Sequence, residues 1–169
     1  YSLSGTDASS MSINSSSGVL TFNSAPDYET KTSYTATVTA SDGTNSVTQN
    51  ITVNVTNIND APVMTSSATF SANENQTAIG RVTATDEEDQ TLTYSLSGTD
   101  SSSIGINSSS GIMTFNSAPD YETKTSYAVT VAISDGTNST TQNITVNVVN
   151  LNDNSPSITS IATFSAAEN

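Results

Sequence analysis

The sequence predicts an all-β fold made of tandem seven-stranded Greek-key β-sandwiches, and three observations lead to that prediction. Residues 1–7 return unchanged as residues 94–100, an internal repeat with an offset of 93. Apolar and polar residues alternate with a period of two, as half-buried strands require. Turn-forming residues interrupt these runs about every ten positions, which is the spacing of a sandwich with about seven short strands.

The internal repeat divides the chain. Residues 1–60 and 94–153 differ at only twelve positions. Two turn-rich linkers, 57–62 and 150–156, combine Asn and Asp with a proline. Because only part of the repeat precedes the first linker, we expect the chain to be a segment of a longer protein. The predicted division is a partial repeat lacking its N-terminal strands at 1–61, a complete repeat at 62–153 and the first strand of a third repeat at 154–169.

The strands are clearest near the end of the complete repeat. In residues 127–133 and 144–148, tyrosine, valine and isoleucine alternate with alanine, threonine and asparagine. Turn residues separate such runs at 107–111 and 134–138. No segment has the apolar spacing of an amphipathic helix, so the prediction contains strands only.

Composition indicates a cation as partner. The chain has 16 acidic and 3 basic residues, with a formal net charge of −13. Nucleic acid and anionic lipid are poor partners for such a surface, because binding to phosphate requires Lys and Arg. No apolar run approaches the roughly 20 residues of a membrane span, so no direct membrane insertion is expected in this segment. Crowded carboxylates without basic neighbours repel one another unless a metal neutralises them.

Five short acidic or amide-rich segments follow one another in the chain. They are Ala72-Asn73-Glu74-Asn75, Thr85-Asp86-Glu87-Glu88-Asp89, Asp120-Tyr121-Glu122, Ser134-Asp135-Gly136 and Asn150-Leu151-Asn152-Asp153-Asn154. In this order they resemble the signature motifs of cadherin repeats, and residues 92–98 are similar to many bacterial cadherin-like repeats. The resemblance covers the entire chain. It implies a cadherin- and immunoglobulin-like sandwich from a bacterial cell-surface or secreted adhesin.

The cadherin resemblance implies calcium ions between successive repeats. At the first junction it implies ligands from Asp27, Glu29, Ile58, Asn59, Asp60, Ala61, Asp86, Glu88 and Asp135. At the second it implies Glu74, Asp120, Glu122, Leu151, Asn152, Asp153 and Asn154. Ala61 stands where the family has Asn, and its backbone carbonyl could still serve.

Residue chemistry agrees with calcium as the cofactor. Calcium takes about six to eight oxygen ligands, and the sequence contains no His or Cys that would select zinc or copper. Asp120 and Glu122 are expected on an extended segment, with both carboxylates on one side and Tyr121 turned into the core. In the motif at residues 85–89, the second acidic ligand is Glu88, or Asp89 if the loop shifts by one residue. The number of calcium ions per junction, two or three, is not determined by the sequence.

Other charged residues receive local interpretations. Asp7 and Asp100 are expected to form Asx turns. Glu87 and Asp89 are interpreted as a solvated charge run. Lys31 and Lys124 are expected to be exposed.

Catalysis is not expected. There is no His or Cys, and the serines lack a general base. The acid pair Asp120 and Glu122 recurs as Asp27 and Glu29, which is typical of a repeated structural site rather than of one active centre.

The predicted function is a calcium-stiffened extracellular or cell-surface array that serves as a spacer, filament or adhesin stalk, for example in a biofilm. One alternative is a polysaccharide-binding module, which a solvent-facing row of aromatic residues would favour. A second alternative is a homophilic filament unit, in which residues 154–169 of a neighbouring copy complete the first repeat by strand exchange.

Overall fold

The computed structural model describes residues 1–159, 163, 165, 166 and 168, and the described chain forms two compact units. The first comprises Tyr1–Val63, Ala84–Leu92 and Ser134–Thr140, and the second Met64–Thr83, Thr93–Ile133 and Thr141–Asn169. The predicted strand of a third repeat falls in 154–169, partly outside the described residues. The repeat boundaries therefore stay predictions.

The first unit is built on a three-stranded antiparallel sheet. Its order is β1-β4-β5, and β4 pairs with β5 along nine residues, from Ser33↔Asn54 to Ser41↔Ser46. A separate hairpin pairs β2 with β3. The elements are β1 (Ser2–Ser4), the 3-10 turn η1 (Ala8–Ser10), β2 (Met11–Ile13), β3 (Leu20–Phe22), β4 (Ser33–Ser41) and β5 (Ser46–Asn54).

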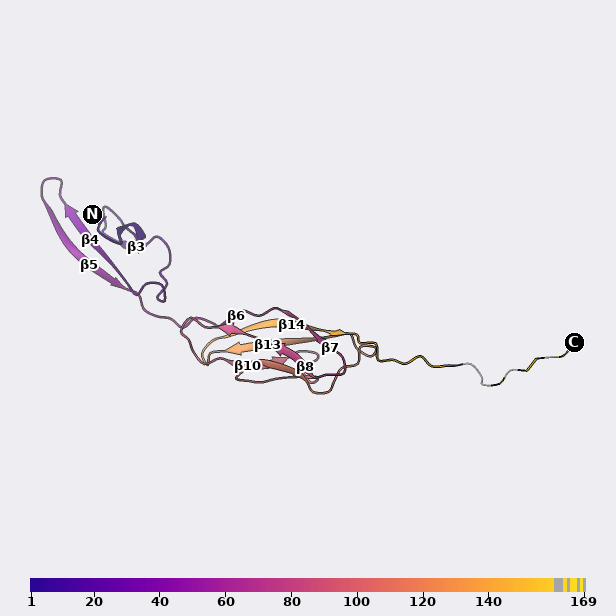
Figure 1. Cartoon of the computed structure of the whole chain (residues 1–169). Coiled ribbons are helices and arrows are strands. Elements are labelled where there is room, and N and C mark those ends of the chain that lie inside the picture. The colour runs from indigo at the N-terminus through magenta and orange to yellow at the C-terminus, as the bar shows by residue number, and fades with distance from the viewer. Residues whose placement is uncertain (160–162, 164, 167, 169) are drawn as a thin grey trace. The chain divides into compact units, whose positions relative to one another are not determined.

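The second unit is built mainly from two sheets. One has the order β10-β13-β14-β7, with β14 and β7 parallel; these four strands are labelled in Figure 1. The other has the order β11-β12-β8. β6 and β9 form a separate short pair outside these two sheets. The bounds are β6 (Val63–Met64), β7 (Thr69–Asn73), β8 (Ala78–Arg81), β9 (Ala84–Thr85), β10 (Thr93–Ser97), β11 (Ile104–Ile106), β12 (Ile112–Phe115), β13 (Ser126–Ser134) and β14 (Ser139–Val149).

The core of the second unit follows the predicted alternation. In β13, Val129, Val131 and Ile133 are buried and their neighbours are not. In β14, Ile144 and Val146 are likewise buried between exposed residues. Burying such side chains stabilises the fold by about 1.5–3 kcal/mol each. The all-β sandwich prediction is confirmed, and no helix in the described residues is long and apolar enough to cross a membrane.

The same sequence pattern is buried less deeply in the first unit. Ile51 and Val53 of β5 are half-buried, whereas their counterparts Ile144 and Val146 are 1% and 0% exposed. In the second unit β7 pairs with β14 along five residues. Within the described residues, no strand of the first unit occupies the corresponding edge of β5. Near-identical strands therefore differ in burial because their neighbours differ.

An ion pair recurs in both units. Lys124 Nζ donates to Asp100 Oδ1, and the Ala128 N–H donates to Asp100 Oδ2 at 2.8 Å. The Lys124 ammonium also lies 4.6 Å from the ring centroid of Tyr127. Asp7 makes the equivalent contacts with Lys31 and with the Thr35 N–H. The Asx-turn prediction for both aspartates is wrong, because each carboxylate bonds to residues 24 or more positions away.

Replacing Asp100 with asparagine should destabilise the chain by about 1 kcal/mol at pH 7. The hydrogen bond from Lys124, followed by that from the Ala128 N–H, holds the pKa of Asp100 below its ordinary value. A lowered folded-state pKa gives stability that is present above the unfolded pKa, about 3.9, and lost as pH falls through the folded pKa. Urea unfolding in chelator should show a deficit in Asp100→Asn that shrinks below about pH 4. A deficit unchanged by acid would contradict this assignment.

Candidate metal centre

Asp27 and Glu29 lie in a tight turn at the edge of the first unit. The Lys31 N–H donates to the Asp27 carbonyl at 3.0 Å and closes the turn. The Thr30 hydroxyl donates to Asp27 Oδ2 at 2.8 Å, and this bond, followed by one from the Thr30 N–H, lowers the pKa of Asp27. The equivalent residues 121–123 also form a turn. The prediction of an extended segment is wrong here, because an aspartate followed three residues later by threonine favours a turn.

Five carboxylates gather around this turn, and we call Asp27, Glu29, Asp60, Glu87 and Glu88 the first acidic cluster. One oxygen each of Asp27, Glu29 and Glu87 lies within 4.8 Å of the others, and the same holds for Glu29, Asp60 and Glu88. Glu29 belongs to both groups. All five residues lie in the first compact unit.

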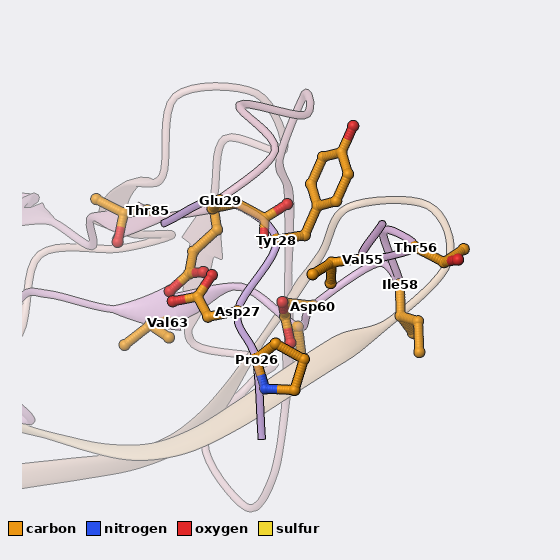
Figure 2. Close-up of a pocket in the computed structure, with 12 residues that line it drawn as sticks. Pro26, Asp27, Tyr28, Glu29, Val55, Thr56, Ile58, Asp60, Val63 and Thr85 are labelled. Carbon is orange, nitrogen blue, oxygen red and sulfur yellow. The ribbon is translucent and has the colours of Figure 1, made fainter. Parts of the chain in front are cut away.

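The first acidic cluster borders a cavity of about 710 Å³ with an apolar wall. Figure 2 shows the carboxylates of Asp27 and Glu29 together, while the ring of Tyr28 points away from them. Ile58 and Ala61, predicted as linker ligands, line the cavity, and so do Pro26 and Val55. Tyr28 is half-buried. The cluster therefore places mostly exposed carboxylates at the border of a recess with an apolar wall.

The charges in the first acidic cluster are not neutralised by basic side chains. In the described part of the chain the ion pairs are Lys31–Asp7 and Lys124–Asp100. The negative charge of Asp27 is the main cause that raises the pKa of Glu87, with contributions from burial and then from Asp60, Glu29 and Glu88. Like charges held this close favour a bound cation.

Two buried carboxylate oxygens in the segment 86–88 have no hydrogen-bond partner among the described residues. They are Oδ2 of Asp86 and Oε2 of Glu88, both predicted ligands. Asp86 uses its other oxygen to accept the Gln90 N–H at 3.2 Å, and Glu88 uses its other oxygen to accept the Asp60 N–H at 3.4 Å. A buried carboxylate oxygen without a partner is costly, and coordination to a cation would satisfy such an oxygen.

Asn59 connects the linker to two loops. Its side-chain Nδ2 donates to Asp135 Oδ2 and to the Asp60 carbonyl, each at 2.9 Å. Gln90 Nε2 donates to Asn59 Oδ1, and Asn138 Nδ2 donates to the Asn59 carbonyl at 2.8 Å. Burial raises the pKa of Asp135, but bonds from Asn59, Thr137 and Asn138 lower it further than burial raises it.

A second acidic cluster, Glu74, Glu122 and Asp153, lies in the second unit. Glu74 is only 1% exposed, and its two oxygens accept the Tyr121 N–H at 2.9 Å and the Leu151 N–H at 2.6 Å. The Leu151 N–H thus bonds to Glu74, and a role of Leu151 as a metal ligand stays a prediction. The amides of Asn150 and Asn75 donate to Glu122 and Asp153, respectively.

Several predicted ligands lie outside the first and second acidic clusters. Asp120 directs its oxygens to the Thr123 hydroxyl and the Glu122 N–H, at 2.8 and 3.0 Å. Asn152 and Asn154 are exposed. Their roles as ligands stay predictions.

Sequence reasoning missed four residues at these sites and misread a fifth. Glu87 was interpreted as solvated charge, yet its carboxylate lies in the first acidic cluster. Its position within Asp86-Glu87-Glu88-Asp89 was the available signal. Gln90 and Asn138 carry uncharged amides outside any motif, whereas Asn75 and Asn150 stand in the motifs at 72–75 and 150–154 but were assigned no role at the site.

Comparison with known proteins decides the family. A sequence model of the cadherin domain matches residues 66–152, which is more than half of the chain. The chain belongs to the cadherin family. Cadherin domains are extracellular, generally calcium-dependent adhesion repeats that typically bind Ca²⁺ between successive repeats. The predicted cadherin resemblance is confirmed.

Individual relatives of this cadherin chain are much longer than it is. Human protocadherin Fat 4 is 35% identical over 143 residues, covering 78% of this chain and 3% of that protein. Chitinase A of Pseudoalteromonas piscicida is 38% identical over 126 residues, covering 72% of this chain and 15% of that protein. The protocadherin gammaB7 EC3-6 cis-dimer structure matches with a TM-score of 0.65 and 30% identity, covering 97% of this chain and 43% of that chain.

Proposed function

We propose that this chain is a calcium-binding segment of an extracellular cadherin array, in which the metal stiffens successive repeats. The observation that carries the proposal is the pair of buried, unpartnered oxygens on Asp86 and Glu88 beside a cluster of uncompensated carboxylates. The donor set consists of oxygens alone, which suits calcium. When bound, calcium supplies positive charge and coordination, and the chain's own residues supply position.

The residues that would hold calcium in the first unit include Asp27, Glu29, Asp60, Asp86 and Glu88. Asn59 and Asp135 flank them through their mutual hydrogen bond. In the second unit the corresponding residues are Glu74, Glu122 and Asp153. Bringing carboxylates from a turn, a linker and a neighbouring loop onto one ion would restrict their relative motion. This supports a mechanical role as a spacer or adhesin stalk.

The alternatives have less support. The match to chitinase A favours a polysaccharide-associated setting. An aromatic binding surface is not favoured, because Tyr94 and Phe115 are buried and Phe70, Tyr121 and Tyr127 are half-buried. Strand exchange between copies and a place in a bacterial surface filament or biofilm stay predictions. We also propose that this segment is not an enzyme, since its recurring acid pairs suit a repeated structural site.

Adding calcium should raise the thermal stability of the chain. Calcium that binds only the folded state at a hundredfold excess over Kd stabilises it by about 2.7 kcal/mol. Melting curves recorded with millimolar calcium and with chelator should therefore have clearly separated midpoints. Magnesium at the same concentration should have a smaller effect, because it prefers a tight octahedron and retains its waters.

A variant localises the effect. Glu29 belongs to both sets of three carboxylates in the first acidic cluster, so Glu29→Gln removes a charge that the two sets share. It should weaken the calcium-induced shift in melting temperature. In chelator it should change the free energy of unfolding by no more than about 0.5 kcal/mol. Identical midpoints for the wild type with calcium and with chelator would overturn the proposal.

A further inference from the structure

Asn59 forms hydrogen bonds through three of its groups. Its amide nitrogen, amide oxygen and backbone carbonyl each have a partner, in Asp135, Gln90 and Asn138, respectively. Asn138 lies 79 positions away in sequence and Gln90 lies 31 positions away. The anchored linker residue, its two partner loops and the first acidic cluster all lie in the first compact unit.

These contacts differ in kind from those of the first acidic cluster. Gln90 and Asn138 are neutral donors, and neither bond requires a cation to neutralise a charge. Asp27, Glu29 and Glu87, by contrast, approach one another as like charges. The two sets of contacts should therefore respond differently when metal is removed.

Among the described residues, none makes a side-chain hydrogen bond to the linker residues just before Asn59 comparable to those that hold Asn59. Ile58 is 79% exposed and Asn57 is exposed. Asn59 itself is half-buried. A flexible point in a linker is expected where few buried contacts restrain the backbone.

We infer that Gln90 and Asn138 are positioning residues that hold Asn59 in place in the absence of metal. Part of the proposed ligand set is then assembled before calcium binds, and the metal-free linker moves at Asn57 and Ile58 rather than at Asn59. Preassembly lowers the ordering cost of binding, so these two neutral side chains strengthen metal affinity without touching the metal. Only the affinity part of this inference rests on the proposed function.

The first repeat provides a matched control. Asn45 is the counterpart of Asn138, and both close the same turn: each backbone N–H donates to the preceding aspartate, Asp42 or Asp135, and each carbonyl accepts a serine hydroxyl. The Asn45 side chain is exposed, whereas that of Asn138 reaches the linker. Asn45→Ala therefore changes the turn as Asn138→Ala does and leaves the linker unaffected.

The decisive measurement is ¹⁵N NMR relaxation of the whole chain in chelator. In the wild type and in Asn45→Ala, Asn59 should have an order parameter of about 0.85, typical of rigid backbone, and Ile58 a lower one. In the double variant Gln90→Ala/Asn138→Ala the value at Asn59 should fall below about 0.6. A flexible Asn59 in the metal-free wild type, or an unchanged value in the double variant, would overturn the inference.

Calcium titrations followed at the Asp86 and Asp135 amides test the effect on affinity. Asn138→Ala should bind about threefold to tenfold more weakly than Asn45→Ala. Equal affinities would refute the contribution of Asn138 to metal binding. Absence of binding in the wild type would instead refute the proposed function, and the relaxation result in chelator would still decide whether Asn59 is anchored.

Discussion

Replacing Gly111 with alanine is expected to destabilise the second unit by about 3–5 kcal/mol. Gly111 has φ +70°, a left-handed conformation that disfavours any side chain. A Cβ at this position would lie 2.3 Å from the Val82 carbonyl oxygen. That oxygen cannot move away easily, because the Val82 N–H donates to the Gly111 carbonyl at 2.9 Å and the Val82 side chain is fully buried.

Gly18→Ala separates the clash from the backbone strain. Gly18 is the counterpart of Gly111 and has φ +72°, but the atoms nearest to a Cβ there would be those of the Tyr1 ring, at 3.3 Å. Its cost should be the left-handed conformation alone, about 1–2 kcal/mol. Chemical unfolding followed by NMR signals from each unit measures both variants. Equal losses would show that the backbone of Val82 yields and that the predicted clash is absent.

Most of the fold could be predicted because its signals are local. Alternation in residues 127–133 and 144–148 requires only that neighbouring side chains point to opposite faces, and burial of Val129, Val131 and Val146 follows it. The internal repeat then predicts the same strands in the first unit. Burial depth was not predictable in this way. Ile51 and Ile144 stand in the same local sequence, but the second unit adds β7 beside β14 and β8 beside β12.

In the candidate sites, the sequence predicted the charged residues better than the uncharged ones. Carboxylates in motifs led to Asp27, Glu29, Asp60 and Glu88, which the structure brings together. The turn at residues 28–30 was missed because the hydrogen bond from Thr30 to Asp27 competes with an extended backbone. The amide contacts around Asn59 depend on loops that meet only in the folded chain, and glutamine and asparagine carry no pattern that predicts a partner.

The largest effect at a site should come from Glu74→Ala, measured in chelator. Glu74 is buried and accepts two backbone N–H bonds, from Tyr121 and Leu151. Its loss leaves both donors unsatisfied, at about 1–3 kcal/mol each, so the second unit should lose about 3–5 kcal/mol. Relief of repulsion with Glu122 and Asp153 offsets only a part of this loss, because both of those carboxylates are exposed.

Glu122→Ala is the matched control, since this carboxylate belongs to the same cluster and is exposed. In chelator it should change stability by no more than about 0.5 kcal/mol. With calcium, both variants should lose stabilisation that the wild type gains. Glu74 would then have two separable roles: its hydrogen bonds join the turn at Tyr121 to the linker at Leu151 without metal, and its charge contributes to binding. Equal losses for Glu74→Ala and Glu122→Ala in chelator would contradict the first role, because Glu74 is buried and accepts two backbone N–H groups, whereas Glu122 accepts an exposed amide of Asn150.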